Sequence, residues 1–182
     1  ISLSSVWKNL PVGDVNDPIV VGDFHQGGVV FYIFVDGDTG YVAGETHGLI
    51  AAVQDQSSGI RWYNGSYVTT GATGTAIGTG SANTDAIINE QGATETSYAA
   101  GLARAYTGGG YTDWFLPSKD ELNLMYTKRV EIGNFTGVRY WSSTEYVNSH
   151  AWDQIFNNPP SNGVFVYDGK GMLWNVRAIR AF

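Results

Sequence analysis

Short runs of hydrophobic and β-branched residues recur along most of the chain from residue 27 onward. Residues 27–34, GGVVFYIF, match a buried strand in length and composition, and the turn-forming DGDTG after them ends it. HGLIAAVQDQ predicts another strand, which begins near Leu49. Four later runs also predict strands: RYWSSTEY (139–146), HAWDQIFN (150–157), GVFVYD (163–168) and NVRAIRAF (175–182).

The pattern changes between these two groups of strands. In IRWYNGSYV, residues 60–68, Asn64-Gly65 stands between aromatic residues, which predicts a hairpin with a type I′ turn. Residues 69–84, TTGATGTAIGTGSANT, contain few side chains that would anchor them in a core. Long loops without secondary structure are uncommon inside compact domains and are often functional, so this loop is a candidate for displaying a binding surface.

Two regions carry hydrophobic residues at helical spacing. The first covers residues 84–90 and 96–106, with a predicted break at Gly92. The second begins at Ser118. There the Ser118 hydroxyl can accept the Glu121 N–H while the Glu121 carboxylate reaches back to the Ser118 N–H, an arrangement called a capping box. The residues expected to form the buried stripe of this helix are Leu122, Met125 and Tyr126.

These elements assign the chain to the α+β class, with strands, two central helices and then several strands, and with termini that can pair with each other. Residues 22–182 are predicted to form one head domain. Residues 1–21 form an N-terminal segment, in which Leu3, Val6 and Leu10 have the spacing of a short amphipathic helix. Such a helix would either dock on its own domain or pack against neighbouring subunits, and the sequence leaves both open.

Composition favours a globular protein with much β structure, because 43% of the 182 residues are hydrophobic, 14% are aromatic and only 15% are charged. The formal net charge of −7 argues against a nucleic-acid binder. No apolar run reaches about 18 residues, so no transmembrane segment is predicted. The chain begins with Ile1, and no basic and then apolar leader follows. We therefore expect a mature or excised part of a longer protein.

The motifs of common enzymes are missing from the sequence. Cysteine is absent, which excludes thiolate metal sites and cysteine nucleophiles. Ser142, Ser143, His150 and Asp153 lie close in sequence, but no Gly-x-Ser-x-Gly motif accompanies them, and YWSSTEY is typical of an inner strand. HExxH and Walker A motifs are also absent, and the three histidines are scattered. We therefore predict that the protein is not an enzyme.

Motifs for binding cations are equally weak. The calcium site of C-type lectins needs Glu-Pro-Asn or Gln-Pro-Asp together with Trp-Asn-Asp, and the nearest strings are WD at 152–153 and WN at 174–175. DGDTG at 36–40 resembles the first half of a calcium loop but lacks the later ligands of an EF-hand, so we interpret it as a polar turn. No cofactor is predicted, and a divalent cation would have to bind without a recognisable motif.

Several stretches, in this order, resemble the Lcl C-terminal-domain family. They are QGGVVFYI, HGLIAAVQDQSSGIRWYNGS, GGYTDWFLPSKDELNLMY, YWSSTEY, HAWDQIF and VRAIRAF, and the resemblance covers residues 22–182. The family is similar to C-type-lectin-like domains, which implies two helices packed on mixed, mainly antiparallel strands with paired termini. The resemblance also implies a bacterial adhesin head after a collagen-like stalk, secreted or held at the cell surface.

The same resemblance implies binding of sulfated glycosaminoglycans such as heparin or chondroitin sulfate, with roles in host attachment, cell aggregation and biofilm formation. It implies a homotrimer as well, because glycine at every third position of a collagen stalk lines a three-chain axis. An alternative interpretation is a protein-interaction or trimer-capping module that displays loops such as residues 69–84 on the lectin-like scaffold. The net charge of −7 favours this alternative somewhat, since a polyanion has to approach an acidic domain.

Sulfated sugars require clustered lysine and arginine side chains, and arginine suits bidentate contact with sulfate. Lys128-Arg129, at the end of the second helix, are the best pair, although cations also favour that end of the helix dipole. At least one of Arg177 and Arg180 is expected to pair with a carboxylate. A competing mode would stack a sugar ring on an exposed Trp or Tyr, but the sequence does not single one out. The candidate ligand-binding residues are Lys128, Arg129, Arg139, Lys119, Lys170 and Arg104, of which Lys170 and Arg104 are predicted to face solvent.

Overall fold

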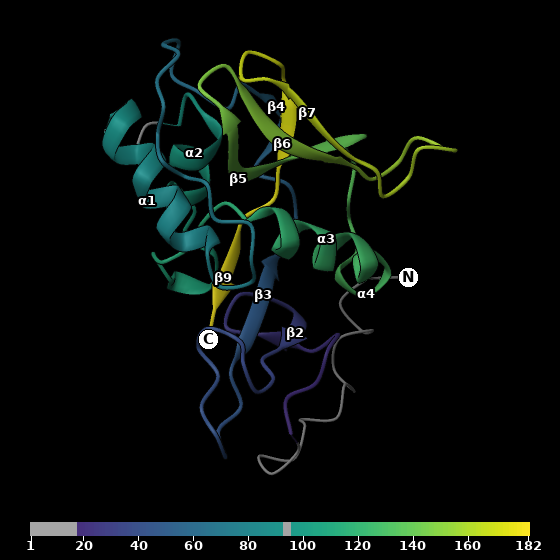
Figure 1. Ribbon diagram of the computed structural model, residues 1–182. Coiled ribbons are helices and arrows are strands. Elements are labelled where there is room, and N and C mark those ends of the chain that lie inside the picture. Colours follow the sequence, from purple (N-terminus) through teal and green to yellow (C-terminus); the bar gives the residue numbers. More distant parts are fainter. Residues whose placement is uncertain (1–17, 93–95) are drawn as a thin grey trace.

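The computed structural model describes residues 18–92 and 96–182, which form an α+β fold, as predicted. Two β-sheets lie one above the other with helices along their flanks (Figure 1). The first sheet has the strand order β1-β2-β3-β9 and is antiparallel throughout. Its strands are β1 (Phe24–His25), β2 (Gly28–Ile33), β3 (Gly48–Ala52) and β9 (Ile179–Ala181).

The second sheet has the strand order β4-β8-β5-β6-β7. β5 and β8 are parallel and the other neighbours are antiparallel, so the predicted mixed and mainly antiparallel arrangement is confirmed. The strands are β4 (Ser57–Ile60), β5 (Arg139–Val147), β6 (His150–Ile155), β7 (Phe165–Gly169) and β8 (Trp174–Val176).

The helices flank the sheets in two pairs. α1 (Gly80–Gln91) and α2 (Ala99–Ala105) lie on one flank, and α3 (Lys119–Thr127) and α4 (Arg129–Ile132) on the other (Figure 1). α1 begins at Gly80 rather than at residue 84. It ends at Gln91, and the next residue, Gly92, has a φ of 103° in the left-handed region, so the predicted break is confirmed. A short 3₁₀ helix, η3 (Gly108–Gly110), follows α2.

Strand β2 is buried on both of its faces, as its continuous hydrophobic sequence predicts. Val30 packs with Ile50 and Trp114 in a hydrophobic cluster that also includes side chains of α1 and α2. The next residue, Phe31, points to the other face of the sheet and packs with Met125 in a second cluster, on the side of α3 and α4. The first sheet therefore separates two halves of the core.

The start of α3 is also the joint between α3 and α1. The predicted capping box forms: the Glu121 N–H donates to Ser118 Oγ at 3.3 Å, and the Ser118 N–H donates to Glu121 Oε2 at 2.7 Å. Glu121 also accepts the Gly78 N–H at 2.8 Å, just before α1. Burial raises the pKa of Glu121, although its hydrogen bonds oppose the rise. Gly80 makes the close approach possible, because a Cβ there would collide with the Glu121 carboxylate.

The hairpin predicted at Asn64-Gly65 is not formed. A type I′ turn needs positive φ at both central residues, and here only Gly65 has one, 121°. The Asn64 N–H instead donates to Gln91 Oε1 at 3.0 Å, which ties the segment to the end of α1. Trp62 is fully buried in the core. Contacts with distant residues therefore override the local turn signal.

Residues 69–84 are anchored to the rest of the domain, so the prediction that they have few core anchors is wrong. Ala72 is buried, and its carbonyl accepts the Glu145 N–H at 2.7 Å. The Asn83 side chain accepts the Gly74 N–H at 3.1 Å and donates to the Gly74 carbonyl at 2.7 Å. The anchors are small or polar residues, which a search for large hydrophobic side chains does not reveal.

The last predicted strand, 175–182, is divided between the two sheets as β8 and β9. Within the described ranges, β9 pairs with β3 and β1 pairs with β2, so the two ends of the domain share a sheet but do not pair as predicted. The amphipathic helix predicted within residues 1–21 falls on residues 1–17, outside the described residues. The domain boundary at residue 22 stays a prediction.

Candidate functional site

Lysine and arginine side chains are the predicted ligand contacts, and nine of the ten lie in the part of the chain that the structure describes. A cation that is already paired with a carboxylate offers less to an external anion, so the unpaired cations decide where an acidic ligand can bind. Those that form ion pairs are Arg104, Lys128, Arg139, Lys170, Arg177 and Arg180.

Lys170 does not face solvent as predicted, because its side chain is completely buried. Its Nζ pairs with Glu145, donates to the Val68 carbonyl at 3.2 Å and lies 4.4 Å from the centre of the Trp62 ring. Burial lowers the pKa of Lys170, and the Glu145 carboxylate opposes this effect. Lys170 therefore holds the turn after β7 against the core and is not available to a ligand.

Arg104 and Arg139 are also engaged within the protein. Arg104 lies 2.5 Å from Asp85 Oδ1 and its side chain is mostly buried, so the prediction that it faces solvent is wrong. The Arg139 guanidinium bridges two carboxylates, Asp168 and Asp153, with 3.4 Å between its Nη1 and Asp153 Oδ2. Neither arginine is free for an acidic ligand.

Both arginines of the C-terminal VRAIR stretch pair with carboxylates, as expected for at least one of them. Arg180 pairs with Asp113. Arg177 is fully buried, with its Nε 2.8 Å and its Nη2 2.7 Å from Asp55 Oδ1. The remaining N–H groups of Arg177 donate to the carbonyls of Ala52, Gly133 and Asn134.

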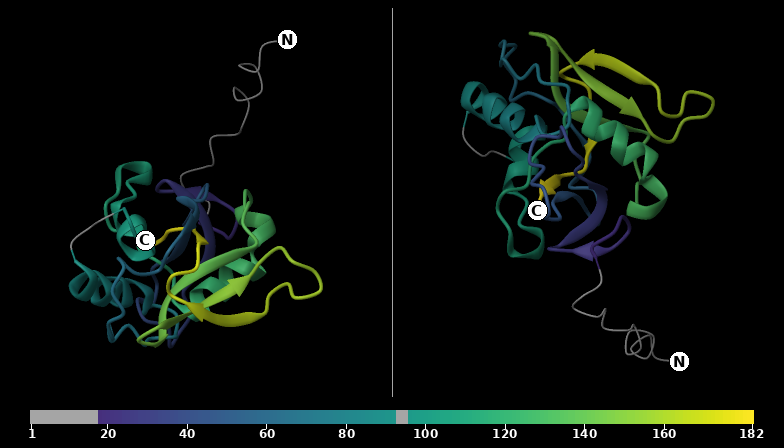
Figure 2. Two further views of the ribbon diagram at one scale, coloured as in Figure 1. Left: turned by 90° about the horizontal axis from the view of Figure 1, so that it is seen from above. Right: turned by 60° about the horizontal axis from the view of Figure 1, so that its bottom comes forward.

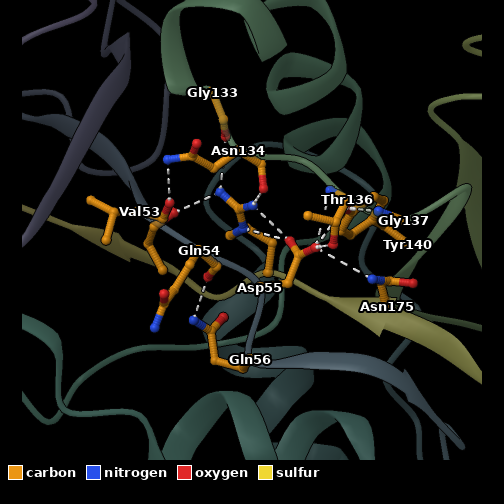
Figure 3. Close-up of polar contacts among 12 residues, drawn as sticks. Val53, Gln54, Asp55, Gln56, Gly133, Asn134, Thr136, Gly137, Tyr140 and Asn175 are labelled. Carbon is orange, nitrogen blue, oxygen red and sulfur yellow. Dashed lines mark hydrogen bonds and ion pairs between the residues drawn. The ribbon is translucent and has the colours of Figure 1, made fainter.

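Asp55, the partner of Arg177, lies at the centre of a polar network that fixes the loop after α4 (Figure 3). Asp55 Oδ2 accepts hydrogen bonds from the Tyr140 hydroxyl at 2.8 Å and from Thr136 Oγ1 at 2.7 Å. Burial raises the pKa of Tyr140, so it remains a neutral donor in this network. The loop 133–137 is thus held by Arg177 at its start and by Asp55 further along.

Three cations have no carboxylate partner among residues 18–92 and 96–182: Lys119, Arg129 and Arg61. Each lies over an aromatic ring instead. Lys119 and Arg129 were both predicted as ligand contacts. Arg61, which the sequence did not single out, is exposed. Lys128, beside Arg129, forms an ion pair with Glu131 at 3.7 Å.

Arg129 lines a cavity of about 260 Å³ together with Asn134, Phe135, Phe156 and Asn157. Tyr126 holds the arginine in place: Arg129 Nη1 donates to the Tyr126 carbonyl at 2.9 Å, and the guanidinium lies 4.2 Å from the centre of the Tyr126 ring. We call this cavity the Arg129 pocket.

The polar network described above positions one wall of the Arg129 pocket. Asn134 has a φ of 57°, and its side chain donates to the Val53 carbonyl at 3.1 Å. Its own carbonyl accepts the Arg177 Nη2 at 2.6 Å. Asn134 is therefore fixed at both its backbone and its side chain. These contacts hold this wall of the pocket in place, which limits the ordering that binding would require.

The pocket combines a cation, amide groups and aromatic rings. Arginine and asparagine amide N–H groups donate to sulfate or carboxylate oxygens, and the half-buried Phe135 offers apolar surface to a sugar ring, with the buried Phe156 beneath it. Sequence reasoning found Arg129 but missed the other lining residues. Phe135, Phe156 and the two asparagines lie outside the strands and helices, and no motif marks them.

The residues considered for catalysis do not assemble into a triad in the structure. Ser142 and Ser143 are fully buried, and the Ser142 hydroxyl donates to the Trp152 carbonyl at 2.8 Å. The His150 ring contacts Ser149 Oγ at 2.8 Å. Asp153 pairs with an arginine, as described above.

DGDTG forms a polar turn in which Asp38 Oδ2 accepts the Tyr32 hydroxyl at 2.8 Å and the Val35 N–H at 2.9 Å. Within the described ranges, no group of three or more His, Asp or Glu side chains is arranged to hold a metal ion. No described helix is both long enough and apolar enough to cross a lipid bilayer.

Comparison with known protein families and with curated proteins finds no match for this chain.

Proposed function

We propose that this domain is a non-enzymatic binding head for acidic polysaccharides such as sulfated glycosaminoglycans. The observation that carries the proposal is the Arg129 pocket, where an arginine without a carboxylate partner lies beside amide groups and aromatic rings. Most cations of the described residues are neutralised internally, so an unpaired arginine in this pocket is a specific place for a sulfate or carboxylate group.

The resemblance to the Lcl C-terminal-domain family supports the wider parts of the proposal. These are a C-type-lectin-like fold, a secreted or cell-surface location on a bacterium, assembly as a homotrimer, and roles in host attachment, cell aggregation and biofilm formation. The alternative, a protein-interaction or trimer-capping module, relied on displayed loops. It receives less support, because residues 69–84 are anchored to the domain.

Replacing Arg129 with glutamine should weaken binding of a heparin-derived oligosaccharide at least tenfold, because a charge-assisted hydrogen bond contributes roughly 1.5–3 kcal/mol and about 1.4 kcal/mol corresponds to a factor of ten. The matched control is Lys128→Gln, which removes one positive charge from the adjacent position. Lys128 is already paired with Glu131, so we expect at most about a twofold change for this variant. Isothermal titration calorimetry of the two variants and the unmodified protein checks this difference.

Equal losses for the two variants would mean that net charge, and not the pocket, governs binding. No binding of heparin or chondroitin sulfate by the unmodified protein would overturn the proposed function. We also expect the affinity to fall between about 0.05 and 0.5 M salt, because the screening length shrinks several-fold over that range.

A further inference from the structure

A second group of side chains without an assigned role lies on the sheet formed by β5, β6 and β7. We call it the aromatic face, and it consists of Tyr146, Trp152, Phe165 and Tyr167. Trp152 and Tyr167 are directly opposite each other on β6 and β7. The Tyr146 and Tyr167 rings are stacked, with centroids 4.1 Å apart and an interplanar angle of 21°, and both pack edge to face against Trp152.

The aromatic face is accessible from solvent. Tyr146 is 46% exposed and Tyr167 is 48% exposed, although large aromatic side chains are usually mostly buried. β7 is an edge strand, and β7 and the loop before it project from the side of the domain (Figure 2). The two rings cover one another in part, and about half of each tyrosine remains open to solvent.

Lys119 stands at the border of the aromatic face, where α3 begins. Its Nζ lies 3.8 Å from the centroid of the Trp152 ring and 4.9 Å from that of Phe165. Its backbone N–H donates to Thr144 Oγ1 at 3.0 Å, which fixes the start of α3 against β5. No carboxylate of the described residues pairs with this ammonium group, so its charge is available to an anion next to the exposed rings.

We propose that the aromatic face binds a sugar ring of the polysaccharide by stacking, with Lys119 placed to receive a sulfate or carboxylate of the same ring or its neighbour. A pyranose has an apolar face of C–H bonds edged by hydroxyls, which matches a half-exposed tyrosine with an apolar ring and a polar hydroxyl. The unpaired ammonium group selects sugars that carry an acidic substituent. The inference rests on the proposed function and adds a second subsite, distinct from the Arg129 pocket, for the same class of ligand.

The test measures binding of a size-defined, heparin-derived oligosaccharide to the double variant Tyr146→Ala/Tyr167→Ala. We expect about five- to tenfold weaker binding, equally at low and high salt, because stacking does not depend on charge. The Lys119→Gln variant should also bind more weakly at low salt, and its deficit should shrink as salt increases. The matched control is Tyr41→Ala, which removes an exposed tyrosine from the loop between β2 and β3 and should leave the affinity unchanged.

Saturation-transfer NMR on the unmodified protein provides a measurement that does not depend on the variants folding. Irradiation of aromatic protons should transfer saturation to the C–H protons of the bound sugar, and its absence would overturn the aromatic subsite. If the unmodified protein binds the oligosaccharide and the folded double variant binds it equally well, this subsite alone is wrong. If the unmodified protein does not bind it, both the proposed function and the subsite are wrong. If the double variant loses binding to a protein partner but keeps its affinity for the oligosaccharide, the aromatic face binds a protein instead.

Discussion

Replacing Asp55 with alanine is expected to lower the free energy of unfolding by about 3–5 kcal/mol, because it leaves a buried charge without its partner. Arg177 is fully buried and cannot reach solvent to recover the lost interaction. The substitution also removes the acceptor for the hydroxyls of Tyr140 and Thr136. Chemical denaturation of the variant and the unmodified protein measures the difference.

The matched control for this prediction is Asp85→Ala, which removes the partner of Arg104. Asp85 is mostly exposed, so water screens its side of the pair, and Arg104 keeps a hydrogen bond to the Ser81 carbonyl at 3.4 Å. We therefore expect a cost of about 1 kcal/mol, clearly below that of Asp55→Ala. Similar costs for the two variants would contradict the assignment of Asp55–Arg177 as the central ion pair. If the Asp55 variant remains folded under mild conditions, weaker oligosaccharide binding is expected as well, since the pair fixes a wall of the Arg129 pocket.

Stability is expected to decline as pH rises from about 4 to about 8, with Asp153 as a main cause. Burial and the nearby Asp168 carboxylate raise the pKa of Asp153 from 3.8 to about 8, and Arg139 opposes the rise. Its Oδ1 is buried without a hydrogen-bond partner among the described residues. Between these two pH values the folded protein keeps a proton that the unfolded chain has released. Each pKa unit corresponds to about 1.4 kcal/mol, so the loss over this window is on the order of several kcal/mol.

The Asp153→Asn variant isolates this contribution, because the amide cannot release a proton and resembles the protonated acid in shape. We expect a flatter dependence of unfolding free energy on pH between about 4 and 8, and higher stability than the unmodified protein at the upper end. Burial also raises the pKa of Glu121, so the variant, and not the profile of the unmodified protein alone, tests Asp153. Asp36→Asn, at an exposed position in a turn, is the control. A profile for Asp153→Asn as steep as that of the unmodified protein would contradict the prediction.

Local signals predicted much of the fold. The capping box at Ser118 and Glu121 forms as the sequence indicates, because all of its hydrogen bonds join residues within one turn. The buried strand at residues 28–33 also follows from its own hydrophobic run. The hairpin at Asn64-Gly65 failed because Asn64 bonds to Gln91, a contact between distant segments that no local pattern contains.

The candidate site was less predictable, because it depends on which charges neutralise each other in space. Lys170 lies in a glycine-rich turn, which predicted an exposed side chain. In the structure the side chain is buried, where it pairs with Glu145 and lies over the Trp62 ring. Lys128 and Arg129 are adjacent in sequence and could not be told apart until the structure paired only Lys128 with a carboxylate. The exposed tyrosines could not be chosen either, because buried and exposed aromatic residues occur in similar strand patterns.

The division of the last run between β8 and β9 has a consequence for biosynthesis. β8 lies between β4 and β5, and β9 pairs with β3, so both sheets include strands from this final stretch. While the nascent chain is still on the ribosome, this stretch is inside the exit tunnel. Without β8, β4 cannot be connected to β5, and without β9, β3 has β2 as its one neighbour in the sheet. Both sheets can therefore be completed only after the last strand of the domain has emerged. Late folding is thus a consequence of the topology.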